Sequence, residues 1–255
     1  MSIIKKARSW AIDYVYMARG NALMTIHKNP PKHYLGYVVA GKAPVILIPG
    51  ITTKWGFMKR LGDRISLAGH PVYVVPKLQY NIFNIPMSAQ KVWNVICDIT
   101  QQTGHTSSNT QEISDKIRVL TETHGIAGAV LVTHSKGGLI GKYLLIHHNH
   151  SRQVKGLVAI AAPFSGSRIA HLIPHNAFKE LRTDSEIIRE LSGHTTVNRR
   201  IISIMPEFDN HVLEGSYLNE ALDNIIVPIH GHHKILFNSD VQNKVLESVE
   251  RLSSL

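Results

Sequence analysis

One short segment, VLVTHSKGG at 130–138, constrains the fold more than any other part of the chain. An apolar run of strand character leads directly to Ser135, and glycines then open a helical pattern. A serine displayed on a tight turn between a strand and a helix needs small neighbours, because the two elements nearly touch there. Gly137 meets this need after the serine, whereas Thr133 stands before it, where glycine is usual. The segment predicts such a corner; the alternative interpretation is a serine N-cap on a glycine-rich helix.

Strand-like apolar runs alternate with helical patterns along most of the chain. The predicted strands are 34–39, 44–49, 71–75, 129–132, 154–161, 201–205 and 224–229. The predicted helices are 54–68, 88–103, 111–124, 135–148 and 239–252, with a polar loop at 104–110. This alternation predicts an α/β fold, with a mostly parallel sheet covered by helices on both faces. Residues 164–198 interrupt it without a strand pattern, which indicates an insertion at the rim of the sheet.

The composition is that of a globular chain that buries a sizeable core. The 255 residues are 44% hydrophobic and 18% charged, which suits one large α/β domain or two small ones. A lone cysteine, Cys97, excludes an intramolecular disulfide and a multi-cysteine metal site, and it is compatible with a reducing compartment. The formal net charge of +10 favours anionic partners such as membrane surfaces or nucleic acid.

A reactive serine needs a base, and the base needs a carboxylate to orient it. In a sheet of this kind the three residues follow one another as serine, acid and histidine. Asp209 lies just after the predicted strand 201–205, and His232 lies in the loop after 224–229. The ends of parallel strands are where such sites are built. The sequence therefore predicts a catalytic triad of Ser135, Asp209 and His232.

Neighbouring residues offer alternatives for two of these roles. Glu207 is close enough to Asp209 to be the acid, and His230 or His233 could serve as the base. A zinc site made from His230, His232 and His233 is a further alternative, but their spacing suits no standard chelate. No metal site is predicted.

Two backbone N–H groups are needed to hold the negative charge that develops during acyl transfer. One is expected from Lys136, the residue immediately after the serine. The other is expected from Ile51, because Gly50 lets the chain turn sharply after the predicted strand 44–49. The competing interpretation of this second motif is an ordinary turn between a strand and a helix.

These residues resemble the lipase and esterase group of the α/β-hydrolases, and bacterial triacylglycerol lipases in particular. The resemblance covers roughly residues 43–252. It rests on VILIPG followed by Trp55, VTHSKGGLIGKYLL, VAIAAPFSGSRIA, DNHV at 209–212 and GHHKIL at 231–236. It implies the same triad and oxyanion amides, and a lid or cap over about 165–198. Three positions depart from the family pattern, namely Thr133, Pro49 and Phe164.

The expected activity is hydrolysis of carboxylic esters of lipids or other hydrophobic alcohols, through an acyl-enzyme and without a cofactor. One alternative is an acyltransferase with the same triad, in which an alcohol replaces water. The other is a non-catalytic module that binds membranes or nucleic acid through its positive charge. Because the chain shows no motif that reads a nucleic-acid groove, no nucleic-acid partner is expected.

The first 30 residues are predicted to form an amphipathic helix and linker ahead of a hydrolase domain at 31–255. On a helical wheel, residues 3–19 separate an apolar arc from a basic one. This helix docks either on the domain or on an anionic membrane. No apolar run reaches the roughly 18 residues of a membrane span, and the N-terminus does not resemble a secretory signal. The expected location is cytoplasmic, with peripheral contact at the inner face of the membrane as one alternative.

Overall fold

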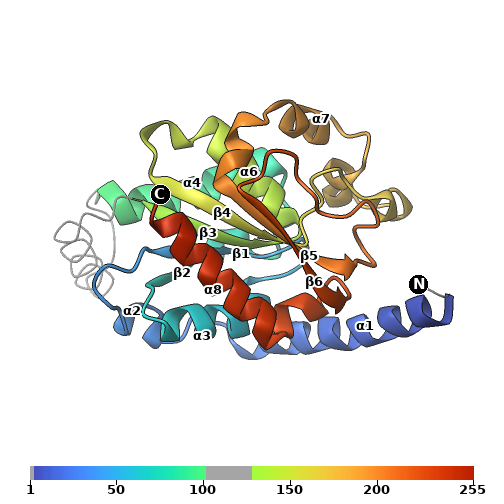
Figure 1. The fold of residues 1–255 in the computed structure, drawn as a ribbon, viewed down its shortest axis with the longest axis horizontal. Helices are drawn as coiled ribbons and strands as arrows, with labels where there is room; N and C mark the ends of the chain where they lie inside the picture. Colours follow the sequence, from blue (N-terminus) through green and yellow to red (C-terminus); the bar gives the residue numbers. More distant parts are fainter. Residues whose placement is uncertain (1–2, 102–127) are drawn as a thin grey trace.

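The computed structural model describes residues 3–101 and 128–255, and its centre is a six-stranded parallel sheet (Figure 1). The strand order is β2-β1-β3-β4-β5-β6, and every neighbouring pair is parallel. The strands are β1 (Val45–Ile48), β2 (Val72–Val74), β3 (Ala129–His134), β4 (Val154–Ile160), β5 (Ile201–Phe208) and β6 (Asp223–His230). Six of the predicted strands are confirmed, and so is the parallel α/β class.

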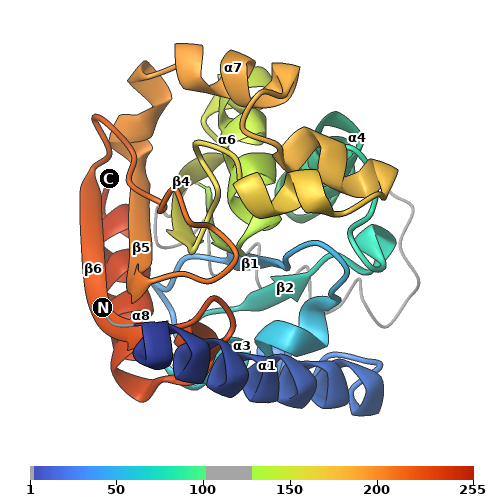
Figure 2. The same ribbon diagram turned by 90° about the vertical axis from the view of Figure 1, so that its right-hand side faces the viewer.

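Helices cover both faces of this sheet (Figure 2). They are α1 (Ile3–Ile26), α2 (His33–Gly36), α3 (Lys59–Leu67), α4 (Ile85–Gln101), α6 (Lys136–His147), α7 (Glu186–Gly193) and α8 (Ser239–Ser253). Alternate residues of a strand point to opposite faces. Ile46 and Leu131 therefore belong to the core beneath α4 and α6, whereas Val45 and Val130 belong to the core beneath α3 and α8. The central strands β1 and β3 are buried along their whole length, as expected of parallel strands covered on both faces.

The predicted strand at 34–39 is wrong, because the chain forms the short helix α2 there. Its apolar residues do not alternate between two buried faces. Tyr34 is fully buried and donates a hydrogen bond from its hydroxyl to the Lys59 carbonyl at 3.2 Å, whereas Tyr37 and Val39 are exposed. This one-sided burial suits a helical turn packed on α3. The predicted helix at 111–124 and the loop at 104–110 lie outside the described residues.

The segment between β4 and β5 lies over one end of the sheet. Residues 161–200 contain no strand in the structure. They form α7 and three short 3₁₀ helices, η4 (Arg168–Leu172), η5 (Asn176–Leu181) and η6 (Thr196–Arg200). The side chain of Ser185 caps α7 by accepting a bond from the N–H of Ile188 at 3.3 Å. The expected strand-free insertion is therefore present as a separate layer of short helices.

Helix α1 docks along the domain, beside α3 (Figure 2). Its close contacts are made by small residues. A Cβ on Gly20 would lie 2.3 Å from the Phe57 ring, and one on Gly56 would lie 2.7 Å from Met24 Cα. The inward face also carries Ser9 and Asp13, which are buried.

Much of the apolar arc of α1 faces solvent and not the domain. Ile4 and Val15 are exposed, and the alanines at 7, 11 and 18 share this outer face. The domain thus receives Ser9, Asp13 and Gly20 together with Met17 and Met24, and part of the apolar arc stays outside. None of the described helices combines the length and the apolar character that crossing a bilayer requires.

The start of α6 should tolerate no side chain at Gly137. A Cβ there would lie 2.4 Å from the Ile48 carbonyl oxygen, so Gly137→Ala must push a helix away from the central strand. We expect the free energy of unfolding to fall by about 1–3 kcal/mol, measured by urea denaturation. Gly193→Ala is the matched control, because a Cβ at that position in α7 meets nothing within 4 Å. An equal loss in both variants would contradict the close approach.

Candidate active site

Ser135 occupies a strained corner between β3 and α6. Its φ is 52° and its ψ is −123°, a conformation that costs an L-residue about 1–3 kcal/mol. The Ser135 N–H donates to the Ile160 carbonyl at 2.9 Å, and its own carbonyl accepts from Gly138 N–H at 2.9 Å. Although Ser135 is the N-cap residue of α6, its hydroxyl makes no capping bond within the described chain. The predicted corner is present, and the hydroxyl is not used as a helix cap.

Small residues around the serine allow three segments to meet. A Cβ on Gly138 would lie 2.4 Å from Ala162 Cβ, and a Cβ on Gly50 would lie 3.2 Å from Ser135 Cβ. Thr133 takes the position where glycine is usual, and it is fully buried with its hydroxyl donating to the Val158 carbonyl at 3.3 Å. The threonine is tolerated because a sheet hydrogen-bond acceptor satisfies its polar atom.

Asp209 and His232 are brought together by the loops that follow β5 and β6. The Nδ1 atom of His232 lies 2.8 Å from Asp209 Oδ2 and 3.1 Å from Oδ1. Oδ1 also accepts from the N–H groups of His211 and Val212, each at 2.8 Å. A carboxylate held this way accepts the Nδ1 proton, so the lone pair of His232 is on Nε2. His232 and Ser135 line the same cavity.

Burial sets the protonation of this pair. Burial lowers the pKa of His232 to about 3, so its imidazole is neutral at pH 7 and can accept a proton. Burial also raises the pKa of Asp209 to about 6, while the two backbone N–H donors act in the opposite direction. Asp209 is therefore ionised at neutral pH beside a neutral imidazole. This is the protonation state that a general base and its orienting acid require.

The two expected oxyanion donors belong to the loop after β1 and to the first turn of α6. Ile51 lines the cavity in the loop after β1. Lys136 is the first residue of α6, and the N–H groups of a first helical turn have no partner inside the helix. The Lys136 side chain is buried and donates to the carbonyls of Asn81 and Phe83. Asn81 Nδ2 in turn donates to the Pro49 carbonyl at 2.7 Å, which ties the Ile51 loop to the helix.

Of the three sequence alternatives, His233 lines the cavity, whereas Glu207 and His230 lie apart from it. Glu207 is mostly exposed, and its Oε2 lies 3.3 Å from His230 Nε2. His230 also lies 3.4 Å from Ser9 Oγ through Nδ1. Neither residue lines the cavity that Ser135 shares with His232.

A second acid–histidine pair was not predicted from the sequence. Asp13 of α1 is fully buried, and its Oδ2 lies 2.8 Å from His233 Nδ1. A sequence signal existed, because Asp13 is the first acidic residue of the chain and the next is Asp63. Asp13, His211 and His233 also place potential metal-ligand atoms within 4.8 Å of one another. Both carboxylate oxygens of Asp13 already accept hydrogen bonds from the loop after β6.

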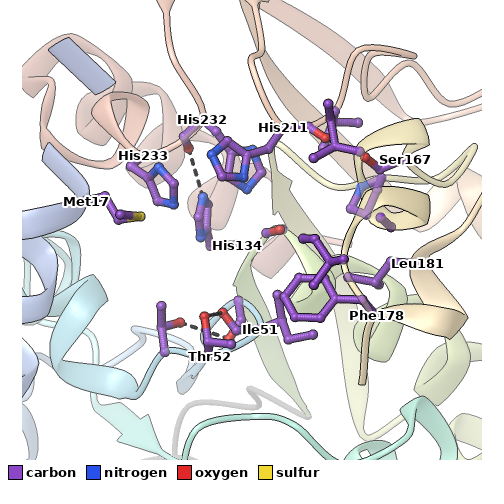
Figure 3. A pocket seen from close by; sticks show the side chains of 18 residues that line it. Met17, Ile51, Thr52, His134, Ser167, Phe178, Leu181, His211, His232 and His233 are labelled. Atoms are coloured by element: carbon purple, nitrogen blue, oxygen red, sulfur yellow. Dashed lines mark hydrogen bonds between the residues drawn. The ribbon is translucent and has the colours of Figure 1, made fainter. Parts of the chain in front are cut away.

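The cavity has a volume of about 160 Å³ and mixes polar and apolar walls (Figure 3). A single water needs only about 10–15 Å³, so the cavity admits a small organic group. His134, His211, His232 and His233 form the polar wall, and Met17 reaches it from α1. The opposite wall is apolar and comes from the insertion: Ile169, Ala170, Ile173, Phe178 and Leu181.

Comparison with known proteins supports the fold. No protein-family model and no curated protein matches this sequence. Among solved structures, Aspergillus fumigatus lipase B superposes with a TM-score of 0.61 at 18% identity, over 87% of this chain and 55% of the lipase. Mature Bacillus licheniformis lipase BlEst2 gives 0.59 at 14% identity, over 88% of this chain and 96% of the lipase.

The chain therefore has the α/β-hydrolase fold in a form similar to that of these lipases. It spans about half the length of the Aspergillus enzyme. The fold class expected from the sequence is confirmed.

The buried imidazoles should make the protein less stable in mild acid. Burial lowers the pKa of His134, His211 and His232 from the ordinary 6.5, so below that pH the unfolded chain binds more protons than the folded one. The raised pKa of Asp209 has the opposite effect on stability in acid, but the combined effect of the three histidines is larger. We expect the free energy of unfolding to be lower by about 2 kcal/mol at pH 5.5 than at pH 7.5, measured by urea denaturation.

His211→Asn, which removes one imidazole, should make this dependence on pH shallower. Equal or greater stability of the unaltered protein at pH 5.5 would contradict the expected burial of neutral histidines.

Proposed function

We propose that the protein is a serine hydrolase that cleaves carboxylic esters of hydrophobic acyl groups. The observation that carries the proposal is the strained Ser135 corner in one cavity with His232, whose Nδ1 is held by Asp209 at 2.8 Å. The fold that the chain shares with lipases is compatible with this chemistry.

In this mechanism, Ser135 Oγ attacks the acyl carbonyl carbon while its proton passes to Nε2 of His232. Asp209 keeps the Nδ1 proton in place and stabilises the imidazolium. The N–H groups of Ile51 and Lys136 hold the tetrahedral oxyanion. The C–O bond to the alcohol then breaks, and His232 returns the proton to the leaving oxygen. Water attacks the acyl-enzyme by the same route, which releases the acid and restores the serine.

The apolar wall indicates the type of acyl group. Phe178 and Leu181 of the insertion lie across the cavity from the histidines, and Ile173 also lines it. Apolar side chains favour a hydrocarbon acyl chain over a charged one. We therefore propose esters of lipids or of other hydrophobic alcohols as substrates, with residues 165–198 acting as the cap. An acyltransferase would use the same residues, and it is distinguished by a transfer product when an acceptor alcohol is added.

Loss of the Ser135 hydroxyl should abolish acyl-enzyme formation. We expect Ser135→Ala to lower kcat for a chromogenic short-chain ester by at least about 10³-fold with an unchanged circular dichroism spectrum. A serine-reactive phosphonate should label Ser135 in the unaltered protein, as mapped by mass spectrometry. His232→Ala and Asp209→Asn should be severely impaired, whereas Glu207→Gln is the control and should stay near the unaltered rate. Labelling at another residue would refute the assignment.

We also propose peripheral contact between α1 and an anionic membrane. The outer face of α1 exposes Ile4 and Val15 by 82% and 68%, and Arg8 and Arg19 are exposed on the same helix. An apolar stripe bordered by cations matches the interfacial region of an anionic bilayer. The net charge of +10 adds long-range attraction. The location proposed for the protein is thus the cytoplasmic face of a membrane.

Removing the apolar stripe should weaken this contact. We expect the double variant Ile4→Ser, Val15→Ser to sediment less with phosphatidylserine-containing vesicles, and binding of the unaltered protein to fall as salt rises from 0.1 to about 0.5 M. Leu67→Ser is the control, because Leu67 of α3 is 65% exposed outside α1. Equal binding to neutral and anionic vesicles, or an equal loss in the control, would refute membrane contact through α1.

A further inference from the structure

We infer that Asp13 of the N-terminal helix is a positioning residue for the catalytic base, because it anchors the loop that carries His232 through three hydrogen bonds. This inference rests on the proposed function and extends the active site to α1, where Asp13 lies 219 positions before His232 in the chain. Asp13 touches neither Ser135 nor the cavity, so it acts through its neighbours.

The hydrogen bonds of Asp13 converge on consecutive residues of the loop after β6. Oδ1 accepts from the backbone N–H groups of His233 and Lys234, each at 2.8 Å. Oδ2 accepts from the His233 imidazole, whose Nδ1 lies 2.8 Å away. One carboxylate therefore fixes the backbone immediately after His232 and also the neighbouring side chain. Bonds to an ionised acceptor are about twice as strong as neutral ones, so this anchor is rigid.

The residue before the base also packs closely on Asp13. Gly231 has a φ of +126°, and a Cβ there would lie 2.4 Å from Asp13 Oδ1. The backbone before His232 thus packs on the same carboxylate that binds the backbone after it. On the other side, Asn210 Oδ1 accepts from the His232 N–H at 2.9 Å, and the His232 carbonyl lies 3.0 Å from His134 Nε2. The backbone around His232 is thus held by contacts to Asp13, Asn210 and His134.

Helix α1 also contributes to the cavity. Met17 lines it one turn beyond Asp13, and the Tyr14 ring lies 5.9 Å from the His211 ring. His211 stacks on His232 with an interplanar angle of 17° and a centroid separation of 4.9 Å. Because Asp13 has its carboxylate on the domain side and the exposed apolar stripe lies on the opposite face, the helix joins a solvent-facing surface to the catalytic loop.

The test uses full-length Asp13→Ala and Asp13→Asn, with the exposed Asp240→Asn as a charge-matched control. The first readout is the rate of Ser135 labelling by a small phosphonate, beside kcat and KM for a short-chain ester. We expect Asp13→Ala to lower the labelling rate and kcat by up to about 10²-fold with KM within about threefold, since misplacing a catalytic group by about 1 Å costs that much. Asp13→Asn should lose less, because its amide oxygen still accepts the two backbone bonds.

The second readout is the pH profile. The groups that face His232 are Asp209, His134, His211, His233 and Asp13. Asp13→Asn removes one negative charge, so the acid limb of kcat/KM should move to lower pH, whereas Asp240→Asn should leave it in place. A purely structural role predicts no such movement.

The third readout does not depend on activity. The imidazole NMR signals of His232 should shift in Asp13→Ala and stay fixed in Asp240→Asn. Unchanged signals, or a loss of labelling that only follows the loss of folded protein, would overturn the role of Asp13. If Asp13→Ala does not fold, Asp13→Asn carries all three measurements. Absence of labelling in the unaltered protein would refute the proposed hydrolase while the NMR comparison still decides the positioning role.

Discussion

The geometry of the site depends on the close approach of the α6 N-terminus to the ends of β1 and β4. Gly137 and Gly138 face the Ile48 carbonyl and Ala162 at distances that exclude a Cβ. This contact holds Ser135 at a positive φ that an isolated serine would avoid. The fully buried central strands β1 and β3 supply the stability that sustains the strain, because both faces of the sheet are packed under helices there. The strained conformation of Ser135 is therefore maintained by the tight packing of the strands beneath it.

Two buried carboxylates hold the histidines beside the cavity. Asp209 and Asp13 each take three N–H groups, one of them on an imidazole, and each belongs to a different layer of the molecule. A low local dielectric strengthens such bonds and makes an unpaired group costly. The histidine wall is therefore held by two carboxylates, and one of these comes from a helix that the sequence presents as an appendage.

Sequence and structure agree best where local chemistry decides the outcome. The corner at Ser135, the strands that flank it and the pairing of Asp209 with His232 were all predictable, because strand–turn–helix geometry and chain order limit where each group lies. Glu207 and His230 were reasonable alternatives by position, yet they pair with each other at 3.3 Å outside the cavity. The mistaken strand at 34–39 arose because a short apolar run carries no information on whether one face or two are buried.

The sequence by itself determined the α/β class and the serine corner, since these follow from hydrophobic periodicity and from where glycine is tolerated. Only the tertiary structure decided which way α1 faces. The wheel of residues 3–19 shows an apolar arc, and burial of that arc is the usual result. The structure instead buries Asp13 and Gly20, because Asp13 finds three N–H donors on the loop after β6 and Gly20 lets the helix approach Phe57. Partners that lie more than 200 residues away leave no periodic pattern in the sequence, so this orientation emerges only when the chain is folded.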